Sequence, residues 1–181
     1  MMHSTYIKPR LMSESENMDV WNAAKNGNVY LLEECFNDDN YFNKYLNRKY
    51  LFMNELYTPL QIAIAHHREE ASSFLIEQGA KLDCTLETGD TLLHMTVKYK
   101  MLGIASELLQ HRANVNTRNY LGETPLYRAV WDDNKEFVEL FVEYRANPNA
   151  RAKNHSTPLS FAMGRENVEA LECMQRCFTE A

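Results

Sequence analysis

One short motif returns at a constant interval along this chain. Its copies begin at Thr58, Thr91, Thr124 and Thr157, so that successive copies start 33 residues apart. A fixed interval of this size indicates a repeat architecture, in which each copy is one structural unit that stacks on its neighbours. The sequence therefore predicts a linear array of similar units.

Each copy is predicted to contain two helices. A threonine suits the position before a helix because its hydroxyl accepts a bond from an orphan N–H group, and the proline that follows in three copies fits the first turn. A small residue recurs at the sixth position, where it lets neighbouring helices approach: Ala63, Thr96, Ala129 and Ala162. A second apolar series with helical spacing follows, as in Phe137, Val138, Leu140 and Phe141.

These motifs resemble the ankyrin repeat family, whose unit reads T-P-L-H-x-A-A near its start and G-A-x-x-N near its end. The resemblance rests on runs such as Thr91-Leu92-Leu93-His94 and on Ala80, Ala113 and Ala146 near the ends of the copies, and it covers roughly residues 18–178. It implies an all-α, elongated and curved solenoid of about five helix-turn-helix units with short hairpin-like tips. The units are expected to start near residues 18, 58, 91, 124 and 157.

The first expected unit is degenerate and is followed by extra residues. Its start at Met18 comes from aligning Ala23 with Ala63, and residues 37–57 are then read as an enlarged loop, with a short helix around Phe42–Leu46. Such a loop serves either a function or the capping of the array. Residues 1–17 carry no repeat signal and are expected to be a flexible segment before a repeat domain at 18–181.

The family's glycines are mostly replaced in this chain. Gly27 and Gly79 survive, whereas other residues stand at the equivalent turns, namely His67, Lys100, Asp133 and Glu166 in one set and Arg112 and Arg145 in the other. If these residues hold a positive φ, each costs on the order of 1 kcal/mol. The sequence thus predicts a moderately stable array.

Charge and apolar runs exclude several protein classes. The net charge of −6 is spread evenly over the chain, which argues against the basic field of a nucleic-acid binder. Apolar runs are too short for a membrane span, and the polar residues after Arg10 argue against a signal peptide. Four cysteines in a chain of this length favour a reduced, cytoplasmic protein.

No catalytic, cofactor or metal site is predicted. Cys173 and Cys177 share a helical face, and His66 and His67 are adjacent, but neither pair has the spacing of a structural zinc site. Cys35 and Cys84 lie outside any Gly-rich elbow, so a nucleophile is not expected. The resemblance implies a structural role for His94, whose ring would bond to backbone between units.

The resemblance places the binding surface on the hairpin tips and the ends of the first helices, which line the concave side of such arrays. The predicted protein-binding residues are Tyr57, His66, Lys98, Tyr99, Arg118, Tyr120, Leu121, Glu123, Trp131, Asp132, Arg151, Lys153 and Arg165. Tyr99, Tyr120 and Trp131 are expected to cluster as an aromatic anchor, since Tyr and Trp are enriched in binding hot spots. The alternative is that Trp131 only covers a neighbouring helix and Tyr120 only caps a tip.

Acidic Glu87 and Asp90 precede basic Arg118, Arg151 and Lys153 along this surface. The pattern predicts a protein partner with an acidic segment beside an apolar anchor, unless the charges are merely solvated. The function expected is a non-catalytic interaction module in the cytoplasm, either a regulatory adaptor or an effector, which as a secreted effector would act in host cytosol. The chain is either free-standing or cut from a longer protein. The alternative is self-association of two chains through the 37–57 loop or the Cys177-Phe178 edge.

Overall fold

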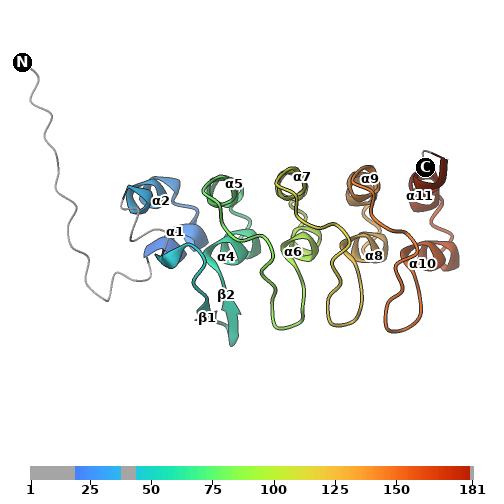
Figure 1. Cartoon of the computed structure of the whole chain (residues 1–181), viewed down its shortest axis with the longest axis horizontal. Coiled ribbons are helices and arrows are strands. Elements are labelled where there is room, and N and C mark those ends of the chain that lie inside the picture. Colours follow the sequence, from blue (N-terminus) through green and yellow to red (C-terminus); the bar gives the residue numbers. More distant parts are fainter. Residues whose placement is uncertain (1–18, 38–43, 180–181) are drawn as a thin grey trace, which may run out of the picture.

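The computed structural model describes residues 19–37 and 44–179, with side chains to residue 175, and arranges them as stacked helix pairs. Figure 1 shows the first helices of the pairs in one row, the second helices in another, and the connecting loops projecting beyond the first row. The pairs are α1 (Asp19–Asn26) with α2 (Val29–Phe36), α4 (Pro59–Ala65) with α5 (Glu69–Glu77), α6 (Leu92–Lys98) with α7 (Leu102–Gln110), α8 (Pro125–Trp131) with α9 (Lys135–Glu143), and α10 (Pro158–Gly164) with α11 (Val168–Thr179). The expected helical repeat solenoid is confirmed. Segment 1–17, Met18 and Phe42 lie outside the described residues.

The repeated threonines begin the first helices as predicted. The hydroxyls of Thr58, Thr124 and Thr157 accept bonds from the backbone N–H three residues later, at 3.3, 3.2 and 3.0 Å. A proline follows each of them in the first turn of the helix. These bonds satisfy donors that the helix itself leaves unpaired, so the motif fixes where each unit starts.

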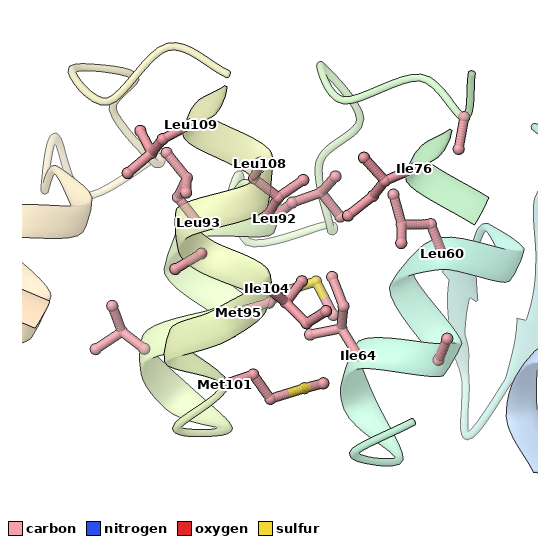
Figure 2. Packing of buried hydrophobic residues seen from close by; sticks show 14 of the residues in the cluster. Leu60, Ile64, Ile76, Leu92, Leu93, Met95, Met101, Ile104, Leu108 and Leu109 are labelled. Atoms are coloured by element: carbon pink, nitrogen blue, oxygen red, sulfur yellow. The ribbon is translucent and has the colours of Figure 1, made fainter. Parts of the chain in front are cut away.

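The apolar side chains form one continuous core along the array. In Figure 2, Leu60 and Ile64 of α4 face the side chains of α6 and α7, among them Met95 and Ile104. The small residues at the sixth position, Ala63, Thr96, Ala129 and Ala162, are all 0% exposed. Their size allows the first helices to pack closely, which is the role that the sequence predicts for them.

The turns that follow the helices hold the backbone geometry that favours glycine. After the first helices, His67, Lys100, Asp133 and Glu166 have φ values of 55°, 55°, 54° and 54°, and after the second helices α7 and α9, Arg112 and Arg145 have 65° and 59°. In each turn a left-handed residue follows the end of a helix and lets the chain change direction. The expectation of positive φ at these substituted glycines is confirmed.

The stretch read as an enlarged loop contains a β-hairpin. Strands β1 (Tyr50–Phe52) and β2 (Glu55–Tyr57) pair antiparallel, with Leu51 opposite Leu56. Residues 44 and 45 are helical, so only the end of the expected short helix falls in the described part of the chain. The hairpin escapes prediction because Met53 and Asn54, with φ of 48° and 71°, form its turn in place of the usual Asn-Gly or Asp-Gly.

The strained turns give a stability prediction. Lys100→Gly should raise the free energy of unfolding by about 0.5–1 kcal/mol, because glycine adopts a positive φ without the clash of a Cβ atom. Lys98→Gly, two residues earlier inside α6, should lower it by a similar amount, since glycine weakens a helix. Urea unfolding of both variants checks the pair, and a loss of stability in Lys100→Gly would contradict the strain argument.

Candidate partner-binding face

A groove of about 330 Å³ lies between two neighbouring tips and the first helices above them. Four of the predicted binding residues line it, Lys98, Tyr120, Leu121 and Glu123, together with Thr88, Asp90, His94, Asn119 and Arg128. The groove therefore joins units that start at Thr91 and Thr124. It mixes two exposed apolar side chains with charges of both signs.

The tip that carries Tyr120 and Leu121 is held firmly. The Asn119 side chain accepts from the N–H groups of Leu121 and Glu123, both at 3.0 Å, and donates to Asp90 Oδ1 at 2.8 Å. The Tyr120 N–H donates to the carbonyl of Thr88 on the preceding tip at 3.1 Å. The tip thus presents its two apolar side chains, 65% and 60% exposed, from an ordered backbone.

His94 forms part of the groove floor in a fixed neutral state. Its Nδ1 accepts from the Thr91 N–H at 3.2 Å, so the proton lies on Nε2, which donates to the Glu123 carbonyl at 3.1 Å. Burial lowers the pKa of His94, and the nearby Asp90 carboxylate opposes this shift. The bond to the next unit confirms the structural role that the resemblance implies.

Arg128 is a groove residue that sequence reasoning missed. At the same position of the two preceding units stand Ile62 and Met95, which are 0% and 1% exposed. An arginine at an otherwise buried apolar position is the signal that would have found it. Its guanidinium pairs with Asp132, with Nε and Oδ2 2.9 Å apart. Arg128 and Lys98 together give the helix side of the groove its positive charge.

The three central aromatic residues do not form the expected cluster. Tyr99 packs edge-on against His67, with ring centroids 5.6 Å apart, and Tyr120 lies over Gly89. Trp131 stacks on Phe161 of the next unit, at 4.8 Å and 19°. The reason is geometric, because tips and helix ends are separate places on each unit. Trp131 is nevertheless 49% exposed.

Several predicted cationic residues also serve the fold. Arg118 donates through Nε to the Gly122 carbonyl at 2.9 Å and through Nη2 to the carbonyl of Arg151. Arg165 donates to the Trp131 carbonyl at 3.0 Å. The Lys153 N–H bonds to the Leu121 carbonyl at 2.9 Å, while its side chain is exposed. The side chains of Arg118 and Arg165 and the backbone of Lys153 therefore tie adjacent units together.

Tyr57 is the last residue of β2, and both Tyr57 and His66 lie against Phe52 of β1. The Tyr57 hydroxyl donates to Glu55 Oε2 at 2.7 Å, and burial together with this carboxylate raises the pKa of Tyr57. His66 packs against Phe52, with ring centroids 5.7 Å apart. Burial and the positive charge of Lys25 lower the pKa of His66. Neither residue reaches the central groove.

The cysteines and histidines of the described residues offer no assembled metal site. Among these residues, no group of three or more His, Cys, Asp or Glu side chains has the arrangement of a metal centre. Cys35 and Cys173 are buried, and burial raises the pKa of Cys84, which disfavours its thiolate. The side chain of Cys177 lies outside the described part. No helix among the described residues is both long and apolar enough to cross a bilayer.

A family model of ankyrin repeats, in three copies, matches residues 73–152. The chain contains ankyrin repeats. Relatives include a Notch homologue 1 of Xenopus laevis, 35% identical over 92 residues, and the Notch protein of Drosophila melanogaster, 38% identical over 73 residues. The matches cover 42% and 40% of this chain and only 4% and 3% of those proteins.

A further relative of this chain is viral. An ankyrin repeat protein of fowlpox virus (strain NVSL) is 38% identical over 74 residues, which cover 40% of this chain and 22% of the viral protein. Ankyrin repeats are in general modules of protein–protein interaction on a non-enzymatic fold. The repeats of this protein therefore imply protein partners.

The state of His94 predicts how the stability of this protein changes with pH. Its pKa lies below the ordinary value of 6.5, so below that pH the unfolded chain binds a proton that the native ring resists. The free energy of unfolding should therefore fall as the pH drops below 6.5.

His94→Gln is the matched variant, because Gln61 occupies the same position of the preceding unit and bonds to the Thr58 N–H at 2.8 Å. Urea unfolding at about pH 7.5 and about pH 5 should show a smaller loss in the variant than in the wild type. Equal losses in the two proteins would show that His94 does not contribute.

Proposed function

We propose that this protein is a binding module whose partner protein docks on the concave face formed by the tips and the first helices. One observation carries the proposal: Tyr120 and Leu121 are exposed on a tip whose backbone is already hydrogen-bonded. Neither side chain stabilises the core, so the exposed apolar area brings no benefit to the fold. Tyr and Trp are enriched in binding hot spots. Besides Tyr120, Trp131 is also exposed.

The charges favour a partner of particular chemistry. Lys98 and Arg128 stand on the helix side of the groove, next to the apolar pair on the tip. A partner segment that places an apolar residue against Tyr120 and Leu121 and a carboxylate near Lys98 would match both features. This is the acidic segment with an apolar anchor that the sequence predicts. Arg118, Arg151 and Lys153 extend the positive surface.

The setting we propose is the cytosol of a host cell, where the protein would act as an effector or a regulatory adaptor. The likeness to the fowlpox virus protein supports the effector form. The Notch relatives are equally compatible with an adaptor. Partner capture from eukaryotic cell lysate therefore tests both forms at once.

Capture of the partner should depend on the exposed tip. The double variant Tyr120→Ala, Leu121→Ser should retain the partner at least about tenfold less well than the wild type, because it removes the apolar anchor. Tyr30→Ala is the matched control, since Tyr30 is 69% exposed on α2, away from the tips. The measurement is affinity capture with mass spectrometry, after circular dichroism has shown that all chains fold.

A protein lost by the double variant and kept by the control would support the proposal. A partner that all three chains retain equally would contradict it.

Self-association is a second candidate, favoured by the last helix pair. Met163 holds the position that Ile64, Val97 and Val130 hold in earlier units, where these residues are at most 2% exposed. Met163 is 62% exposed. The side chains of Cys177 and Phe178, the edge predicted to pair two chains, lie outside the described residues. Met163 is an exposed apolar residue of the same unit that the structure does describe. A second chain could cover it.

If the last units pair, the mass of the wild type should rise with concentration. Met163→Glu should remain monomeric over the same range, because pairing would bury an unpaired carboxylate. Tyr30→Glu is the control on another exposed surface. Sedimentation equilibrium measures the mass, and a wild type that stays monomeric at every concentration would rule this candidate out.

A further inference from the structure

The hairpin β1–β2 has one face anchored to the array. Trp21 lies against Phe52 and Tyr50, with ring centroids 5.4 and 6.1 Å apart. Lys25 Nζ lies 4.4 Å from the centroid of the Phe52 ring. Aromatic and cation–aromatic contacts of this kind fix the position of the hairpin. Figure 1 shows it projecting in the same direction as the loops of the later units.

The other face of the hairpin is apolar and open to solvent. Leu51 and Leu56 are directly opposite each other in the ladder and are 71% and 40% exposed. Met53, in the turn that joins the strands, is 83% exposed. Because side chains alternate along a strand, the two leucines share the face that points away from Trp21. This outer hairpin face, formed by Leu51, Met53 and Leu56, buries little and gives the fold little.

Met53 is also held in an unfavourable conformation. Its φ of 48° is one that glycine, asparagine and aspartate adopt easily and methionine rarely does. The position therefore combines backbone strain with an exposed apolar side chain. A glycine would remove both costs. Strain kept at an exposed site indicates that the side chain is used for something other than folding.

Three basic residues lie in the segment that leads into strand β1. Lys44, Arg48 and Lys49 are exposed, and none of them forms an ion pair with a carboxylate of the described residues. Their contacts are to rings and backbone: Lys44 and Arg48 lie over Tyr45, Arg48 also over Tyr50, and Lys49 Nζ donates to the Thr85 carbonyl at 3.3 Å. Glu55, the single acidic residue between 44 and 57, is bonded to Tyr57. This basic hairpin belongs to a chain whose net charge is −6.

We propose that the outer hairpin face is a second binding surface, which takes an apolar peptide segment flanked by acidic residues. The leucines and Met53 would bury the apolar residues of the segment, and Lys44, Arg48 and Lys49 would meet its carboxylates. An anionic lipid surface has similar chemistry, but the acidic remainder of the chain would be repelled from it. The site is separate from the groove between the tips, so it stands independently of the function proposed above.

The test is a titration of the ¹⁵N-labelled chain of 181 residues with a defined peptide, monitored by the shifts of the backbone amides. The probe peptide carries three central leucines with two glutamates at each end, and the control peptide carries lysines in place of the glutamates. The glutamate peptide should shift the amides of Lys49–Tyr57, and these shifts should persist in the tip variant Tyr120→Ala, Leu121→Ser, in which the other proposed surface is removed. The lysine peptide should bind at least about tenfold more weakly.

Two variants separate binding from folding. Met53→Gly should unfold no more easily than the wild type, because it relieves the positive φ, yet should bind the glutamate peptide about tenfold more weakly. Leu51→Thr keeps strand preference and should weaken binding similarly. In the tip variant Tyr120→Ala, Leu121→Ser the hairpin amides should titrate with this peptide as they do in the wild type, so failure at one surface is distinguishable from failure at the other.

Four results would overturn the proposal. The first is the absence of amide shifts in the hairpin, and the second is equal binding of the two peptides. The third is Leu51-dependent sedimentation with phosphatidylserine vesicles without peptide binding, which would assign the face to a lipid surface. The fourth is a concentration-dependent mass that Leu51→Thr abolishes, which would assign it to a second copy of the chain.

Discussion

No helix pair in this protein can bury its own apolar side chains, and the rest of the structure depends on the stacking that this requires. Ile64, Val97 and Val130 are shielded by the following pair, whereas Met163, at the same position of the last pair, is largely exposed. The free energy of folding therefore resides in the contacts between neighbouring units. Small residues at the sixth position of each unit follow directly, because a larger side chain there would hold the first helices apart.

Stacking aligns the tips as well, and the polar groups of the tips are satisfied from one unit to the next. The Tyr120 N–H reaches Thr88, and the Lys153 N–H reaches Leu121, in equivalent bonds one repeat apart. His94 bonds to the Glu123 carbonyl, and one repeat later the Tyr127 hydroxyl bonds to the side-chain hydroxyl of Ser156 at 2.8 Å. The exposed apolar pair of the 118–123 tip is made possible by the order that the network imposes.

The sequence predicts the features that recur and misses those that occur once. A fixed interval fixes the helix pairs, and a threonine cap or a left-handed turn can be read at each equivalent position. The partner of a side chain cannot be read in this way. Trp131 stacks on Phe161 because the next unit places an aromatic ring at that position. The residues adjacent to either of them in sequence do not indicate this contact. Arg128 could have been found, because it breaks an apolar series that the interval makes visible.

The hairpin departs from the repeat pattern and thereby exposes an apolar face. In later units a tip depends on its neighbour for backbone bonds, so its main chain is tied into the array. Strands β1 and β2 instead satisfy each other, with Leu51 and Leu56 as one pair in their ladder. The contacts of one hairpin face with Trp21 hold the strands in place, and the opposite face contributes little to the stability of the stack of helix pairs. A strained, exposed methionine at Met53 can persist there because the neighbouring units do not depend on it. Because of this independence, the requirements of binding can determine the residues of the hairpin without disturbing the stack of helix pairs.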